Sequence, residues 1–148
     1  MIDLVISMIL AISLNLIPPI PGAINVRDFY VSENIYASGH RGIDLLASEN
    51  SQVLAAEDGY ISHSGFIFNR WTISVTHNTF RTTYEPVKPI VKIGQKVKQG
   101  EVIGYLQTQG SHCFPKSCLH FGLKEGSTYF NPRFSLVKKY PILLPIYS

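Results

Sequence analysis

The sequence predicts an all-β protein, folded as a compact antiparallel sandwich or barrel-like domain. Short stretches alternate apolar and polar side chains, most clearly from Trp71 to His77, and this period of two is typical of strands. Glycine, asparagine and proline separate the stretches at short intervals, as turns do in all-β domains. No segment between the apolar N-terminal stretch and residue 123 shows convincing helical periodicity. At 148 residues, the chain suits one domain with its own core.

The N-terminal stretch Leu4–Ile17 is almost wholly apolar. It is shorter than the about 20 residues that a spanning helix needs, and it has the length of the apolar part of a secretory signal. A basic n-region is missing, because Arg27 is the first Lys or Arg, and the Pro-rich run 18–23 breaks any helix. We therefore expect a signal-like or anchor segment with a linker at 1–22, which leaves N-terminal membrane association open. A secreted or envelope-located domain follows at 23–148.

Local patterns place the strands in order along the chain. The expected ranges are 26–31, 53–56, 60–64, 71–77, 80–84 and 128–130. Asp58-Gly59 is a strong tight-turn signal, Gly65 is expected to end its strand, and Asn78-Thr79 makes the next turn.

Prolines limit the later elements. Pro86 and Pro89 exclude a central strand around them. Pro132 suits the first position of a short helix over 133–137. The tail 140–148 is apolar and Pro-rich, and the sequence gives it no assignment.

The stretch 39–45 carries side chains that can bind a metal. Read as a strand, it puts His40, Gly42 and Asp44 on one face and apolar residues on the other. The stretch 118–123 has the same form.

In this second stretch Cys118, His120 and Gly122 share a face. Two histidines and one aspartate are good zinc ligands, and they leave a fourth position for water, as hydrolytic sites require. The alternative is two ordinary half-buried strands whose polar residues face solvent. The two motifs together, each with a glycine that lets a ligand approach the backbone, favour zinc bound by His40, Asp44 and His120.

Cys113 and Cys118 leave three interpretations of the second motif. They can form a local disulfide, Cys118 can bind zinc as a thiolate, or it can simply pack. An exported chain favours the disulfide, whereas a cytosolic one favours free thiols or ligands.

The charge balance is mildly basic, with a formal net charge of +3. The cluster Lys88, Lys92, Lys96 and Lys98 is typical of a solvated sheet edge that resists aggregation. An Arg-rich or aromatic-basic pattern is absent from the sequence, so we expect no nucleic-acid partner.

Six short motifs occur in the order seen in one peptidase family. They are His40-x-x-x-Asp44, Asp58-Gly59, Thr82-Thr83-Tyr84, the glycine-spaced run 94–104, Leu119-His120-Phe121 and Asn131-Pro132. Over 39–132 the chain thus resembles the lysostaphin-type zinc metallopeptidases, which cut peptide cross-links in bacterial peptidoglycan. The resemblance implies the duplicated-hybrid-motif β fold and zinc held by His40, Asp44 and His120.

Two positions depart from the family pattern. The family usually has His-x-His at the second motif, where this chain has Cys118, and a further histidine where this chain has Pro86. These substitutions resemble an actinobacterial branch of the family. Since the two histidines flank the zinc-bound water in the family, their loss leaves activity open.

Three side chains are candidates to replace the missing histidines. His112 precedes the cysteine pair, and a Cys113–Cys118 loop would hold it close to the zinc strand, so His112 is the preferred catalytic candidate. His77 is better explained as a half-buried sheet residue, and Glu85 adjoins the position of one absent histidine.

Two functions follow from the motifs and their departures. The first is a secreted zinc endopeptidase that acts on peptidoglycan or a wall peptide, with zinc-activated water as the nucleophile. The second is a weak or inactive family member that binds the wall or regulates another wall hydrolase.

Overall fold

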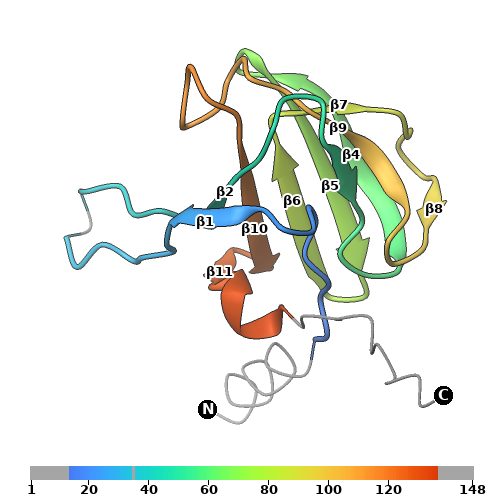
Figure 1. The fold of residues 1–148 in the computed structure, drawn as a ribbon. Coiled ribbons are helices and arrows are strands. Elements are labelled where there is room, and N and C mark those ends of the chain that lie inside the picture. Colours follow the sequence, from blue (N-terminus) through green and yellow to red (C-terminus); the bar gives the residue numbers. More distant parts are fainter. Residues whose placement is uncertain (1–13, 35, 137–148) are drawn as a thin grey trace, which may run out of the picture.

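The computed structural model describes residues 14–34 and 36–136 (Figure 1). This part of the chain consists almost entirely of β-strands, which confirms the predicted fold class. The elements are β1 (Ile24–Arg27), β2 (Ile43–Leu46), β3 (Gln52–Leu54), β4 (Gly59–Ile67), β5 (Arg70–His77), β6 (Phe80–Glu85), β7 (Val87–Pro89), β8 (Lys96–Val97), β9 (Val102–Leu106), β10 (Cys118–Glu125), β11 (Thr128–Phe130) and the 3-10 helix η1 (Pro132–Ser135). Within these ranges, a helix of the length and apolarity needed to cross a membrane is absent.

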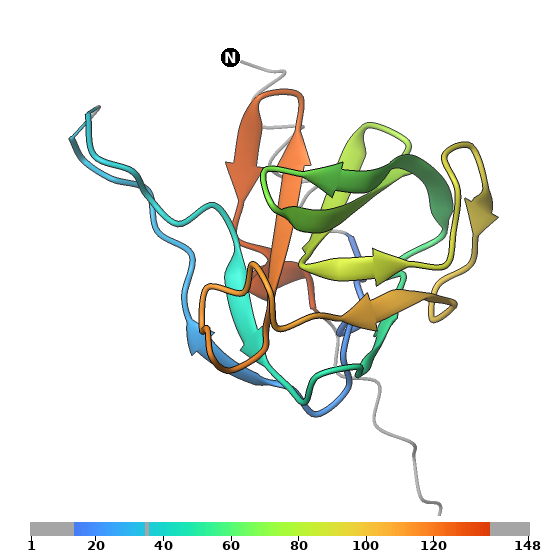
Figure 2. The same ribbon diagram turned by 90° about the horizontal axis from the view of Figure 1, so that it is seen from above.

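Two antiparallel sheets make up the domain. The larger sheet has the strand order β1-β2-β10-β6-β5-β4-β8, and β11 pairs with β10. The smaller sheet has the order β3-β9-β7. In Figure 2 two strands of the smaller sheet, β7 in yellow and β9 in orange, run beside the green strands β4 and β5, and β5 contacts β7.

The core lies on one face of the larger sheet. On β10, Leu119, Phe121 and Leu123 are buried in it, whereas His120 points to the opposite side. Strand β6 alternates in the same way, with Tyr84 fully buried. We call the side that carries His120 the outer face of the larger sheet. Because paired residues of neighbouring strands share a face, the register between β10 and β6 defines what lies beside His120.

The sequence predicts a tight hairpin turn at Asp58-Gly59, and this prediction is wrong. Strands β3 and β4, which flank it, belong to different sheets, so the chain crosses between sheets here. Gly65 does not end its strand either, because it pairs with Thr72 inside the β4–β5 ladder. The turn comes later, at Phe68 and Asn69, whose φ angles are +48° and +67°.

Other local predictions agree better with the structure. Asn78 has a φ of +55° and makes the turn between β5 and β6. Strand β7, which contains Pro89, lies at an edge of the smaller sheet, as the prolines require. Asn131 caps η1, and its side chain accepts a hydrogen bond from the backbone N–H of Arg133.

The N-terminal part of the described chain packs into the domain. Leu16 is fully buried and Ile20 is almost so, and both belong to the core. Leu16 also forms a parallel bridge with Leu136. Most of the apolar stretch Leu4–Ile17, and all of the tail 140–148, lie outside the described residues.

A chain of buried hydrogen bonds ties strands β5 and β6 to the crossing between the sheets. The N–H of Ala56 donates to the hydroxyl of Tyr84 (2.9 Å), which lies 2.9 Å from the Thr82 hydroxyl. The Thr82 hydroxyl lies 2.8 Å from His77 Nε2, and His77 Nδ1–H donates to the carbonyl of Asp58 (2.6 Å). Burial raises the pKa of Tyr84 to about 12. Burial also lowers the pKa of His77, so a neutral imidazole fits the chain.

Candidate metal centre

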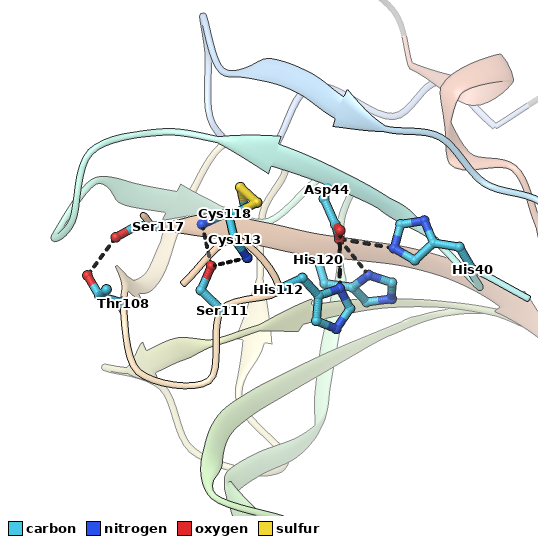
Figure 3. The surroundings of a disulfide bond; sticks show 9 residues. All are labelled: His40, Asp44, Thr108, Ser111, His112, Cys113, Ser117, Cys118 and His120. Atoms are coloured by element: carbon cyan, nitrogen blue, oxygen red, sulfur yellow. Dashed lines mark hydrogen bonds and ion pairs between the residues drawn. A yellow bond between two sulfur atoms is a disulfide. The ribbon is translucent and has the colours of Figure 1, made fainter. Parts of the chain in front are cut away.

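Four side chains from separate segments meet at the outer face of the larger sheet (Figure 3). His40 precedes β2, Asp44 lies on β2, and His120 lies on the neighbouring strand β10. His112 comes from the loop between β9 and β10. One ligand atom from each side chain can be chosen so that all four lie within 4.8 Å of one another.

The carboxylate of Asp44 is the centre of this cluster. Its Oδ1 lies 3.1 Å from His40 Nε2 and 2.9 Å from His120 Nδ1. Its Oδ2 lies 3.1 Å from His112 Nδ1. The Asp44 side chain is only 1% exposed, so three imidazoles replace the water that an ionised carboxylate would otherwise bind.

Electrostatics favour an ionised Asp44. Burial by itself would raise the pKa of this carboxyl group. The hydrogen bonds and positive charge of His112 and His120 outweigh burial, and they hold the pKa of Asp44 below its ordinary value. The site therefore keeps an anionic oxygen ligand at neutral pH.

His40 reaches the cluster through a short bridge and not through the continuous strand that the sequence predicts. Strand β2 begins only at Ile43, and His40 pairs with Tyr30 in an isolated antiparallel bridge. Its Nδ1–H donates to the carbonyl of Asp28 at 2.8 Å. That bond fixes the ring and turns Nε2 toward Asp44, as a metal-binding histidine requires.

Close packing of β2 against β10 sets the position of His120. Its Cα pairs with that of Asp44 in the register of the two strands. A Cβ atom at Gly42 would collide with the carbonyl oxygen of Phe121 and lie 2.9 Å from the Cε1 and Nε2 atoms of His120. Glycine at position 42 is therefore needed for the two motifs to approach.

A disulfide closes the loop that carries His112. Cys113 and Cys118 are bonded, with 5.6 Å between their Cα atoms, which confirms the disulfide interpretation. The Ser111 hydroxyl accepts hydrogen bonds from the backbone N–H groups of Cys113 (3.1 Å) and Cys118 (2.8 Å) (Figure 3). With both sulfurs bonded, Cys118 offers no thiolate to a metal.

The other candidates lie away from the cluster. His77 is buried in the hydrogen-bond chain described above, which is the structural role preferred for it. Glu85 faces His120 across the β6–β10 register, but its Oε2 interacts with Thr72 (3.2 Å) and with Arg70 (3.7 Å). Among the described residues, His112 is thus the histidine that joins the two motif histidines at Asp44.

The donor set indicates which metals fit. Imidazole nitrogens and a single carboxylate suit zinc and similar transition metals, whereas calcium and magnesium prefer sites of several oxygen ligands.

The three histidines of the cluster differ in exposure: the side chain of His112 is 29% exposed, against 14% for His120 and 4% for His40. His112 is therefore the imidazole most open to a substrate or to water.

Comparison with known proteins identifies the family of the chain. The model of peptidase family M23 matches residues 38–132. Uncharacterized protein Rv2891 of Mycobacterium tuberculosis is 35% identical over 124 residues, covering 80% of this chain and 49% of that protein. Peptidoglycan DD-endopeptidase ShyC of Vibrio cholerae is 35% identical over 97 residues, covering 64% of this chain and 22% of that protein. The chain thus spans about half the length of the first relative.

A solved peptidase structure has a similar fold. The antimicrobial peptidase lysostaphin from Staphylococcus simulans superposes with a TM-score of 0.68 at 22% identity, over 84% of this chain and 56% of that structure. At this identity the likeness concerns the fold. The sequence match covers residues 38–132, which include both candidate motifs, and from it we conclude that this chain belongs to peptidase family M23, the lysostaphin-type metallopeptidases.

Proposed function

We propose that this chain is a zinc-dependent endopeptidase of the cell envelope that cuts cross-link peptides of bacterial peptidoglycan. The observation that carries the proposal is the convergence of His40, Asp44 and His120, from two distant segments, with His112 beside them. The family match and the similarity to a peptidoglycan endopeptidase supply the substrate class.

His40 Nε2, an Asp44 oxygen and His120 Nδ1 are the atoms that would hold zinc. They belong to side chains of low exposure, and His40 is oriented by its bond to the Asp28 carbonyl. Zinc bound by three protein ligands lowers the pKa of a water to about 7 and polarises the substrate carbonyl.

His112 is the general base in this proposal. Its imidazole is the most exposed of the three, and it reaches the shared carboxylate from the loop between β9 and β10. A histidine at this place can take a proton from the attacking water and return it to the leaving amine, a role that contributes about 10²- to 10⁴-fold to rate. The disulfide keeps the histidine within reach.

A role of His112 as a fourth ligand is the alternative for the same geometry. Its Nδ1 lies as close to Asp44 as the nitrogens of the other histidines do. Four protein ligands would close the zinc site, and closed sites are structural, not catalytic. Binding and cleavage measurements on a His112 variant distinguish the two roles, as described in the Discussion.

Export to the envelope belongs to the same proposal. A disulfide persists in oxidising compartments and is rare in the cytosol, which supports location outside the cytoplasm. The apolar residues before Leu16, which itself packs in the core, supply the signal-like or anchor segment predicted within 1–22. Peptidoglycan lies in the compartment to which these features lead.

The experiment combines a metal assay with wall digestion. The purified chain is expected to bind about one zinc ion and to release soluble fragments from cross-linked peptidoglycan, and a chelator should stop the release. His40→Ala should abolish both, whereas the matched variant His63→Gln, outside the cluster, should keep zinc binding. Digestion by the His40→Ala protein without metal would refute the proposal.

A binding or regulatory module is the second candidate. This candidate is favoured by Glu85, whose carboxylate pairs with Arg70 and whose strand position faces His120. It is also favoured by Pro86, which occupies the position at which the family resemblance predicts a histidine. Such a module would hold wall peptides or activate another wall hydrolase without cutting. Zinc binding without any zinc-dependent release of wall fragments would support this candidate and exclude the first.

A further inference from the structure

Three cations gather on the outer face of the larger sheet, beyond the metal cluster. Lys124 lies on the same strand and face as His120, four residues further along β10. Arg81 of β6 and Tyr129 of β11 are its partners in the neighbouring strands, so both share this face. Arg41 adjoins His40 and extends toward the same place. We call Arg41, Arg81, Lys124 and Tyr129 the cationic patch.

The ring of Tyr129 brings two of the cations together. The guanidinium carbon of Arg41 lies 5.1 Å from the ring centroid, and the ammonium nitrogen of Lys124 lies 5.2 Å from it. Each contact is a cation–π interaction, worth about 0.5–1 kcal/mol at an exposed site. Two like charges near one ring repel each other, and a nearby anion would reduce that repulsion.

Negative partners for these cations are missing from the described part of the chain. Within residues 14–34 and 36–136, no ion pair involves Arg41, Arg81 or Lys124. By contrast, Arg70 and Arg133 each pair with a carboxylate. Charged donors that a fold gathers but leaves unpaired provide a ready site for an anionic ligand.

Strand β10 links the patch with the metal cluster. At an advance of about 3.3 Å per residue, Lys124 lies about 13 Å along β10 from His120, the length of about four extended residues. Gly122 is the residue between them on this face, and it is itself buried. A Cβ there would lie 2.5 Å from the Thr83 hydroxyl, so the strip has no room for one.

We propose that the cationic patch binds a free carboxylate of the wall peptide while the peptide's scissile bond lies at the metal cluster. A guanidinium and an ammonium group suit a carboxylate, and the Arg41 fork can bind it through two parallel hydrogen bonds. The patch then selects peptides that carry a free carboxylate about four residues from the cut bond. This inference rests on the proposed function for its substrate class, but it is tested by binding alone.

The test uses the full chain, stripped of metal by a chelator so that hydrolysis cannot contribute. The probes are two synthetic cross-linked stem-peptide dimers, one with free carboxylates and one with every carboxylate converted to the amide. Isothermal titration should give about tenfold tighter binding of the free-carboxylate dimer, the value of one charge-assisted hydrogen-bond site. The double variant Arg41→Gln/Lys124→Gln should bind both dimers equally.

The matched control is Lys92→Gln/Lys96→Gln, which removes the same charge beside β8 at the far edge of the sheet. It should keep the wild-type preference, whereas loss of preference in this control would show a general charge effect and overturn the inference. Equal binding of both dimers by the wild type, or binding of neither, would also overturn it. So would tight binding of a glycerol-phosphate oligomer with no binding of the dimers. Carboxylate-dependent binding without any zinc-dependent cleavage would sustain the patch while refuting the endopeptidase.

Discussion

Replacing Gly42 by alanine tests how the two metal motifs are held together. The added Cβ would collide with the Phe121 carbonyl oxygen and lie 2.9 Å from two ring atoms of His120. Ordinary carbon contacts begin near 3.4 Å, so the His120 ring would have to move by about 0.5 Å. The Phe121 oxygen is backbone of β10, so relief also requires that strand to shift from β2.

The expected cost has two parts. Overpacking of this kind lowers the free energy of unfolding by about 1–3 kcal/mol. Displacing His120 away from Asp44 should weaken zinc binding by about 10- to 100-fold, the range seen when the groups that orient a ligand are lost. Wall digestion at limiting zinc should fall in the same proportion.

Two measurements check this prediction. Competition with a chromophoric chelator gives the zinc affinity, and urea titration gives the free energy of unfolding. Gly65→Ala is the matched control, because a Cβ there meets its nearest atom, His63 Cε1, at an ordinary 3.6 Å. If Gly42→Ala binds zinc as tightly as the wild type, then the close approach of the motifs does not position His120, and the reasoning fails.

Three further predictions concern the base, the buried histidine and the disulfide. His112→Gln should keep zinc affinity within about threefold while wall cleavage falls by about 10²- to 10⁴-fold, and a parallel loss of affinity would make His112 a ligand. Burial lowers the pKa of His77, so as the pH falls this imidazole is protonated in the unfolded chain before it is protonated in the folded one. The contribution of neutral His77 to the free energy of unfolding is therefore complete above about pH 6.5 and decreases below it. Urea titrations at about pH 7.5 and 5.5 should show a decrease in the free energy of unfolding for the wild type and a smaller decrease for His77→Gln. Equal decreases in the two proteins would contradict the burial of a neutral His77. Replacing Cys113 and Cys118 by serine should lower the free energy of unfolding by about 2 kcal/mol, as expected for a closed loop of this size, and an unchanged urea midpoint would count against it.

The convergence of His40, Asp44 and His120 could be predicted because their chemistry is visible in single residues. Imidazole and carboxylate are distinctive ligands, and strand alternation correctly placed His120 on the polar face of its strand. His40 also points to the predicted side, but for a different reason, because it lies before β2 in an isolated bridge with Tyr30. The approach of His112 was predicted from the cysteine pair alone, since a short closed loop next to the second motif restricts where that histidine can lie.

Sheet membership was harder to predict from local patterns. Asp58-Gly59 has the sequence of a hairpin turn, yet the strands around it pair with partners far along the chain. The carbonyl of Asp58 instead accepts the hydrogen bond from His77, and its carboxylate accepts one from the backbone N–H of Gln99. Such long-range partners decide the crossing, and no local signal encodes them. The cationic patch was missed for the same reason, because Arg41, Arg81 and Lys124 are neighbours only in the sheet.

The bridge between Leu16 and Leu136 fixes where the described chain enters and leaves the domain. It joins the first and last parts of the described chain, and the Leu16 N–H donates to the Ser135 carbonyl at 2.8 Å. Figure 1 shows the two ends of the described chain, in blue and red, at the lower end of the domain, with the loop before β10 at the upper end. Both ends of the described chain therefore leave the domain on the side away from the loop that carries His112.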